Sequence, residues 1–178
     1  LPGNLPRPWP VLEAAWRKQI ATVPGAADSA YVAQLLEQVF PALGSQGRLI
    51  LLNPNAGDLL PQRRWPAERY VLLAQALLQR HPQACVGFIG AAVDAAAVEA
   101  MVKAVASPRC ASLAGAVAVG ELPALFGRSC LLVSNDSGPA HIASLTQTRT
   151  LVLFGPETPL LYLPLGKARA LYAALPCS

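Results

Sequence analysis

Short apolar segments alternate with longer segments of helical periodicity from residue 48 onward. Residues 49–52 contain no polar side chain, which is typical of a strand covered on both faces of a sheet. The predicted strands are residues 48–53, 85–89, 111–113, 130–134 and 150–154, and the predicted helices are residues 65–79, 93–106, 121–126 and 139–145. Because strands and helices that alternate over short links form parallel sheets, we predict an α/β fold, a Rossmann-like parallel sheet with helices on both faces.

Residues 1–46 precede the first predicted strand and differ in composition from the rest. We predict a Pro-rich linker at residues 1–10 and helices at residues 11–21 and 30–40. Asp28 or Ser29 can cap the second of these helices. We interpret residues 1–46 as a linker with flanking helices and residues 47–178 as the α/β domain, with an irregular Pro-rich tail after residue 156.

Composition excludes several classes of function. The chain is 53% hydrophobic and carries 14 Lys and Arg against 10 Asp and Glu, a net charge of +4 without a long basic run. This mild excess fits a small anionic ligand better than nucleic acid. The four cysteines form no C-x-x-C pair, and Cys85 and Cys130 fall in apolar segments, so we favour buried thiols in a reducing compartment over a disulfide or metal framework. With two histidines and no apolar stretch of about 18 residues, neither a His-based metal site nor a membrane span is predicted.

Residues 131–141 read strand, tight turn, helix, which is an arrangement that binds anions. The first N–H groups of a helix have no internal partner, and Gly138 lets a phosphate approach them. The alternative for Asp136-Ser137-Gly138 is an ordinary helix cap. Because a carboxylate repels a diphosphate, we expect Asp136 to accept hydrogen bonds from sugar hydroxyls. His141 is a candidate donor to phosphate or sugar oxygens, or else a histidine packed under the loop.

A second candidate anion element is the predicted loop 54–64. Its small residues Ala56 and Gly57 allow close approach to a ligand, and Arg63 and Arg64 can fork onto diphosphate oxygens. The alternative is a solvated basic turn. The adjoining Trp65-Pro66 is expected to fix the start of the next helix to the core rather than to stack on a base.

Asp94 opens a predicted helix directly after a strand, where nucleotide-binding folds often place an acid on the ribose hydroxyls. Capping of that helix is the alternative. The sequence contains no G-x-G-x-x-G, G-x-x-x-x-G-K-[ST] or G-x-S-x-G motif, which leaves dinucleotide-binding folds, P-loop enzymes and α/β-hydrolases without support.

From about residue 49 onward the chain resembles the C-terminal half of family 9 glycosyltransferases, the lipopolysaccharide heptosyltransferase group. The likeness rests on Asn53-Pro-Asn-Ala-Gly57, Arg63-Arg-Trp-Pro-Ala-Glu-Arg69, Ile89-Gly-Ala91, Ser134-Asn-Asp-Ser-Gly-Pro-Ala-His-Ile-Ala143 and Leu153-Phe-Gly-Pro156. It implies a GT-B architecture of two Rossmann-like domains, of which the C-terminal one binds the nucleotide-sugar donor. A start without Met and an end at Cys177-Ser178 lead us to expect a fragment of a longer protein.

The resemblance also implies roles for individual residues. It places Ala56, Gly57, Ser137, Gly138 and His141 on the diphosphate, Arg63 on phosphate and sugar, Asp136 near the transferred sugar, Asp94 on the ribose and the backbone near Val117 at the base. Two positions depart from the family pattern, because Arg63 stands where the family often has Lys and Asp94 is shorter than the usual Glu. The family's catalytic base lies in the N-terminal domain, for which this chain has no matching segment.

These observations predict the donor-binding domain of a bacterial, metal-independent, inverting glycosyltransferase without a cofactor. An ADP-heptose-like donor and a cell-surface glycolipid or polysaccharide acceptor are expected, with Arg63 stabilising the leaving group. The expected location is the cytoplasm, at the inner face of the inner membrane. A sugar-nucleotide epimerase-like domain and a non-catalytic nucleotide-binding module are the alternatives.

Overall fold

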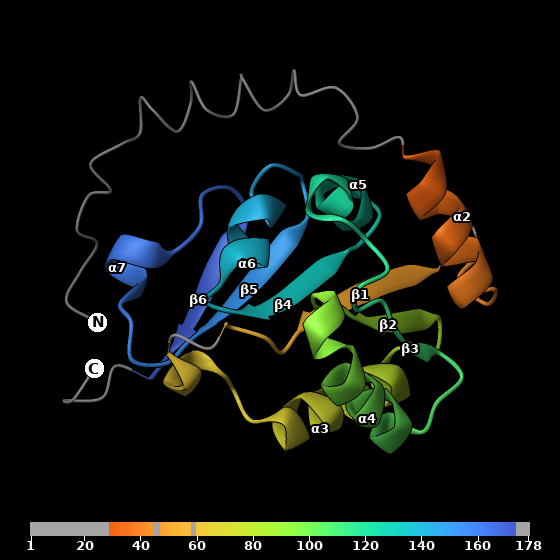
Figure 1. The fold of residues 1–178 in the computed structure, drawn as a ribbon, viewed down its shortest axis with the longest axis horizontal. Helices are drawn as coiled ribbons and strands as arrows, with labels where there is room; N and C mark the ends of the chain where they lie inside the picture. The colour runs from red at the N-terminus through yellow and green to blue at the C-terminus, as the bar shows by residue number, and fades with distance from the viewer. Residues whose placement is uncertain (1–28, 45–46, 58–59, 174–178) are drawn as a thin grey trace.

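The computed structural model describes residues 29–44, 47–57 and 60–173 (Figure 1). The linker predicted at 1–10, the helix predicted at 11–21 and Cys177 lie outside these residues. The strands are β1 (Arg48–Asn53), β2 (Ala84–Phe88), β3 (Cys110–Ser112), β4 (Leu131–Asn135), β5 (Arg149–Phe154) and β6 (Ala168–Tyr172). The α-helices are α2 (Ala30–Val39), α3 (Ala67–Arg80), α4 (Ala95–Val105), α5 (Leu122–Gly127), α6 (Gly138–Ala143) and α7 (Pro159–Tyr162), with short 3-10 turns η1 (Pro61–Arg63), η2 (Ala92–Asp94) and η3 (Val119–Glu121).

The strands form one parallel sheet in the order β3-β2-β1-β4-β5-β6. The chain leaves β1 toward one side of the sheet and leaves β4 toward the other, so the strand order reverses between them. In open α/β sheets ligands bind beyond the carboxyl ends of the strands at this reversal. The α/β class and the parallel sheet are confirmed, and the fold directs attention to the ends of β1 and β4.

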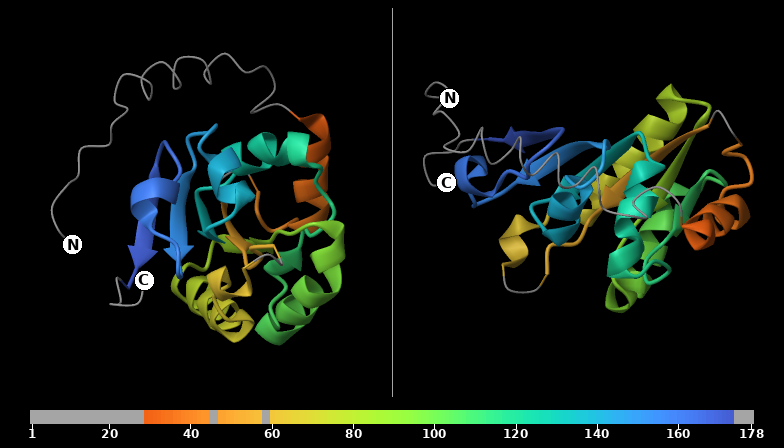
Figure 2. Two further views of the ribbon diagram at one scale, coloured as in Figure 1. Left: turned by 60° about the vertical axis from the view of Figure 1, so that its left-hand side comes forward. Right: turned by 90° about the horizontal axis from the view of Figure 1, so that it is seen from above.

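Helices cover both faces of the sheet (Figures 1 and 2). On one face α3 and α4 pack over β1 and β2, through a core that includes Tyr70, Val98 and Phe88. On the other face α2, α5 and α6 pack over the central strands. All five residues of β2 are buried, as are five of the six in β1, which is why these strands contain so few polar residues.

Helix α2 belongs to the domain core. The Ser29 side chain accepts a hydrogen bond from the backbone N–H of Val32 and so caps the helix, which confirms one of the two predicted caps. Val32, Leu36 and Phe40 are buried together with Leu125 of α5. Helix α2 thus shares a core with the sheet and α5.

The structure corrects three expectations. The tail predicted to be irregular contains α7 and the edge strand β6, and the predicted loop 54–64 contains the 3-10 turn η1. Strand β6 was not predicted, although residues 170–175 are apolar. It follows a Pro-rich segment, and it is an edge strand with three of its five residues exposed, so it lacks the pattern of a strand buried on both faces. The Cys130 thiol, predicted to be buried, is exposed at the start of β4, whereas Cys85 and Cys110 are buried as expected.

Replacement of Leu36 by Ala tests whether α2 is integral to the domain. Leu36 is 4% exposed, so the substitution leaves a cavity between α2 and α5. We expect the free energy of unfolding to fall by about 2–5 kcal/mol in urea denaturation. The neighbouring exposed residue offers a control, since Glu37→Ala should change stability by less than about 0.5 kcal/mol. Equal effects of the two substitutions would mean that α2 is not docked.

Candidate functional site

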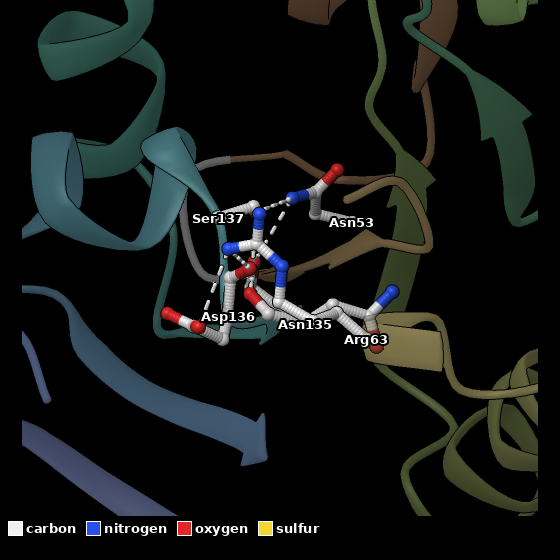
Figure 3. Close-up of polar contacts among 6 residues, drawn as sticks. Asn53, Arg63, Asn135, Asp136 and Ser137 are labelled. Atoms are coloured by element: carbon white, nitrogen blue, oxygen red, sulfur yellow. Dashed lines mark hydrogen bonds and ion pairs between the residues drawn. The ribbon is translucent and has the colours of Figure 1, made fainter. Parts of the chain in front are cut away.

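The candidate site lies where the central strands end. Asn53 at the end of β1 pairs in register with Ser134 of β4. The Asn53 Nδ2 group donates hydrogen bonds of 2.9 Å to the Oγ atoms of both Ser134 and Ser137 (Figure 3). The Ser134 hydroxyl in turn donates to the Asn135 carbonyl at 2.7 Å. These bonds hold the turn before α6 against the end of β1, so two segments 84 residues apart share one edge of the site.

The Asn135 amide joins three segments at this edge. Its Oδ1 accepts a hydrogen bond of 3.0 Å from the Trp65 backbone N–H, and its Nδ2 donates one of 2.7 Å to the Pro54 carbonyl. The Tyr70 hydroxyl lies 3.1 Å from the same Oδ1 and 3.0 Å from the Asn53 carbonyl, so its single hydrogen is shared between two acceptors. Because Asn135 is fully buried, these contacts fix the loop after β1 and the start of α3 relative to β4.

Trp65 packs where the sequence predicted. Its ring meets that of Tyr70 edge to face, with centroids 5.2 Å apart and an interplanar angle of 76°. It also packs against the core beneath α3. The expectation that Trp65 fixes the start of this helix rather than stacking on a base agrees with that position.

Arg63 and Asp136 form an ion pair at the mouth of the site. The Arg63 Nη1 atom lies 3.5 Å from Asp136 Oδ2 and 3.5 Å from the Asp136 backbone carbonyl (Figure 3). Asp136 is only 3% exposed, so the carboxylate that we expected to be open to sugar hydroxyls instead faces this guanidinium. The Arg63 Nε atom is buried without a hydrogen-bond partner. At 3.5 Å the contacts are long for hydrogen bonds, which leaves the guanidinium able to serve a stronger acceptor.

A cavity of about 500 Å³ opens at this edge of the sheet. Its polar lining comprises Asn53, Asn55, Arg63, Arg64, Asp94 and Ser137 together with Ala56, Gly57, Gly90 and Gly138. Its apolar lining includes Ile89, Val93, Leu113, Val117, Val119, Leu122 and Leu125. The cavity thus has cations and amides beside the turns after β1 and β4, and a wall of aliphatic side chains beneath η3 and α5. This division suits a ligand with one anionic part and one apolar part.

Eight of the predicted site residues line this cavity, and two do not. The eight are Ala56, Gly57, Arg63, Arg64, Asp94, Val117, Ser137 and Gly138. Asp136 lies behind Arg63, and His141 is exposed on α6 outside the lining. The exposure of His141 also argues against the alternative that it packs under the loop.

The turn before α6 presents backbone rather than side chains. No side chain caps this helix, and no heavy atom lies within 4 Å of where a Cβ on Gly138 would be. The N-terminus of α6 is therefore not capped by a side chain, and the space beside Gly138 is open. Because α6 spans only six residues, its dipole is small, and the donors themselves matter more than the helix field.

Two glycines and one aspartate shape the chain beside the cavity. Gly57 has φ = +64°, a conformation that favours glycine, and its carbonyl accepts a hydrogen bond of 2.8 Å from Arg64 Nη2. A Cβ on Gly90 would lie 2.6 Å from Asn55 Nδ2, so this position has no room for a side chain. Asp94 Oδ2 accepts a 2.8 Å hydrogen bond from the Ala91 N–H, which supports the capping alternative, while Asp94 also lines the cavity.

Several site residues were not singled out from the sequence. Asn135 resembles an ordinary turn residue, and its role depends on three segments meeting in space. The aliphatic wall from η3 and α5 carries no motif, and only the position of Val117 was expected, from the family resemblance. Among the described residues no group of three or more His, Cys, Asp and Glu could hold a metal ion.

Comparison with known proteins identifies the family. The family model described as glycosyltransferase family 9 (heptosyltransferase) matches residues 4–177. The chain belongs to this family. The family 9 match begins well before residue 49, where the sequence motifs start, so it includes α2.

Curated family 9 relatives are much longer than this chain. Lipopolysaccharide heptosyltransferase 2 of Salmonella typhimurium is 32% identical over 134 residues, which are 73% of this chain and 38% of that protein. Lipooligosaccharide heptosyltransferase 2 of Haemophilus influenzae is 32% identical over 102 residues, 56% of this chain and 29% of its own length. The chain thus spans well under half of the relatives it matches.

Solved family 9 structures share the fold. The structure of E. coli ADP-heptose LPS heptosyltransferase II matches with a TM-score of 0.70 at 28% identity, over 82% of this chain and 44% of that one. The glycosyl transferase family 9 structure from Veillonella parvula also matches with a TM-score of 0.70 at 27% identity. The match covers 83% of this chain and 41% of that one. The predicted α/β class, matching GT-B heptosyltransferases, is confirmed.

Replacement of Tyr70 by Phe tests the hydrogen bonds around Asn135. Loss of this buried hydroxyl should lower the free energy of unfolding by about 1–2 kcal/mol near pH 7. Burial raises the pKa of Tyr70, and its hydrogen bond opposes that rise only in part. The folded state therefore keeps a proton that the unfolded state releases above about pH 10, so stability should fall there by about 1.4 kcal/mol per pH unit.

The readout is urea denaturation of the original protein and Tyr70→Phe from pH 7 to pH 11. The variant should lose the Tyr70 share of the alkaline decline, so the two curves should approach each other at high pH. Parallel curves across this range would show that Tyr70 is not held neutral by the fold.

Proposed function

We propose that this chain is the donor-binding domain of a glycosyltransferase that uses a nucleoside diphosphate sugar of the ADP-heptose type. Family 9 membership and the 28% identity to a protein described as ADP-heptose LPS heptosyltransferase II support this class of donor. The observation that carries the proposal is the two-part cavity at the carboxyl edge, with Arg63 and bare backbone amides at one part and an aliphatic wall at the other.

In this proposal each part of the cavity receives one part of the donor. The diphosphate lies against the amides of Ser137 and Gly138, the loop at Ala56 and Gly57, and the guanidinium of Arg63. The base packs on the aliphatic wall near Val117, and Asp94 accepts hydrogen bonds from the ribose. Adenine suits such a wall better than guanine, because the apolar lining offers no side-chain partner for the extra carbonyl and amino groups of guanine.

Arg63 is the proposed stabiliser of the leaving group. When an acceptor hydroxyl attacks the anomeric carbon, the bond from that carbon to the phosphate oxygen breaks and negative charge grows on the nucleoside diphosphate. A guanidinium held near this oxygen is worth more as the charge grows. The buried Asp136 holds Arg63 at the cavity mouth, and its carboxylate reaches sugar hydroxyls only where Arg63 turns toward the phosphate. His141 is exposed on α6 outside the cavity lining, so it would contact the donor only where the donor extends beyond this cavity.

The remaining chemistry belongs to parts of the protein outside this chain. We assign the base that takes the proton of the acceptor hydroxyl, and the site for a lipopolysaccharide or related glycolipid acceptor, to a second domain. The names of the relatives support this acceptor class. Among the described residues, none of the helices has both the length and the apolar character needed to span a bilayer. From the proposed acceptor class, we propose action at the cytoplasmic face of the inner membrane.

A calorimetric panel of nucleotides tests the donor class directly. ADP and ADP-heptose should bind more tightly than GDP, because the aliphatic wall leaves the polar groups of guanine without partners, and much more tightly than inorganic phosphate. Adenosine should bind weakly. Absence of binding at millimolar nucleotide, in protein shown by circular dichroism to be folded, would contradict the proposed function.

Replacement of Arg63 by Gln tests the anionic part of the cavity by itself. Loss of a charged donor to the diphosphate should weaken ADP about 10-fold or more, which corresponds to about 1.4 kcal/mol, and leave adenosine unchanged. Arg69→Gln is the matched control, since Arg69 is exposed on the first turn of α3 and does not line the cavity. Equal losses for ADP and adenosine would show that Arg63 supports the fold rather than the phosphate.

A further inference from the structure

Charge is segregated between the two edges of the sheet. The segments that lead into the six strands contain Arg48, Arg80, Arg109, Arg128, Arg149 and Lys167 and no Asp or Glu. The acids follow the strands instead: Asp94, Asp136 and Glu157 come after β2, β4 and β5. Because the strands are parallel, all of the leading segments meet at the amino edge, opposite the proposed donor cavity.

Two adjoining hollows bring the cations at the amino edge together. One, of about 510 Å³, is lined by Arg48, His81, Cys130 and Arg149 among others. The second, of about 730 Å³, is lined by Arg149, Lys167 and Arg169 among others, and shares Leu131 with the first. No acidic residue lines either hollow. We call Arg48, Arg149, Lys167 and Arg169 the basic face.

The basic face spans neighbouring strands. Leu131 of β4 pairs in register with Arg149 of β5, and Thr150 of β5 pairs with Ala168 of β6. Strand β4 lies between β5 and β1, and β1 begins at Arg48. The basic face therefore spans the starts of four adjacent strands, of which β1, β5 and β6 carry the cations, rather than converging on a single point.

The charges of the basic face are not neutralised within the described residues. Arg48, Arg149 and Lys167 form no ion pair or side-chain hydrogen bond there, and all three are exposed. Arg109 behaves differently, because its guanidinium donates to the carbonyls of Leu78, His81 and Ala84 and so fixes the end of α3. Arg48 and Arg149 line the first hollow together with Cys130. Partial desolvation raises the pKa of the Cys130 thiol, and the charges of the two arginines oppose that rise.

We propose that the basic face docks this domain on a bilayer surface rich in anionic phospholipid. The choice of a bilayer rests on the proposed function, since a glycolipid acceptor is carried in a membrane. Cations spread over four strand ends suit an extended anionic surface better than one small ion. Nucleic acid is disfavoured because no Phe, Tyr or Trp side chain lines either hollow to stack on a base.

Docking at this edge leaves the donor cavity accessible. The cavity opens at the carboxyl edge, at the far ends of the same strands, so lipid at the basic face does not cover it. Each Lys or Arg near an anionic surface typically raises partitioning about fivefold. Four such residues acting together would raise it by a factor on the order of several hundred at low salt.

Vesicle co-sedimentation of the full chain tests the proposal. Vesicles of phosphatidylcholine with phosphatidylglycerol should bind the protein, and vesicles of phosphatidylcholine alone should not. Reversal of one charge in Arg149→Glu should lower partitioning by roughly 20-fold. The matched control Arg69→Glu alters net charge equally at the carboxyl edge and should have an effect of less than about threefold. Binding of the unaltered protein should also fall steeply from about 0.05 M to about 0.5 M salt.

Three results would overturn the proposal. These are equal losses in Arg149→Glu and Arg69→Glu, binding that does not depend on phosphatidylglycerol or salt, and displacement of the protein from vesicles by a DNA duplex at equal phosphate concentration. ADP calorimetry on the unaltered protein separates this proposal from the proposed function. In that protein, ADP binding without vesicle binding refutes the basic face alone, and vesicle binding without ADP binding refutes the donor site alone. Arg149→Glu should bind ADP as tightly as the unaltered protein, because Arg149 does not line the donor cavity.

Discussion

The site depends on one buried amide. Asn135 ends β4 and bonds to Pro54 after β1 and to Trp65 before α3, so three segments that carry candidate ligand-binding groups are fixed to one point. Without it, the Trp65 N–H and the Pro54 carbonyl would lose their side-chain partner. A buried amide with all of its partners in place is stiff, because any displacement leaves polar groups unsatisfied in an apolar surrounding.

The ion pair of Arg63 with Asp136 has a similar effect at the cavity mouth. An isolated buried carboxylate is costly, and an arginine beside it compensates that charge. The contact distance of 3.5 Å is longer than that of a strong charge-assisted hydrogen bond, so Asp136 positions the guanidinium without holding it tightly. A guanidinium that is already positioned, and that makes only long contacts to its partner, loses little side-chain entropy when it binds a diphosphate. It also gives up few hydrogen bonds.

Sequence patterns predicted the features that depend on short segments. Apolar runs located the four inner strands β1, β2, β4 and β5, because a strand buried on both faces must be largely apolar. Small residues and arginines after those runs indicated Gly57, Arg63 and Ser137. Features that depend on packing were out of reach: β6 exposes most of its residues, and the pairing of Arg63 with Asp136 needs η1 to rest against the end of β4. The donor class itself came from family motifs rather than from periodicity.

The segregation of charge follows from the same topology that builds the site. In a parallel sheet every strand starts at one edge and ends at the other. Basic residues in the segments before the strands therefore gather at one edge of the sheet. Acids at the carboxyl edge cap turns or pair with Arg63, as Asp94 and Asp136 do. Cations at that edge would serve an anionic ligand. At the amino edge, Arg109 bonds to backbone carbonyls, whereas Arg48, Arg149 and Lys167 have no ion pair or side-chain hydrogen bond among the described residues. The fold thus offers anion-attracting regions at opposite edges of the sheet.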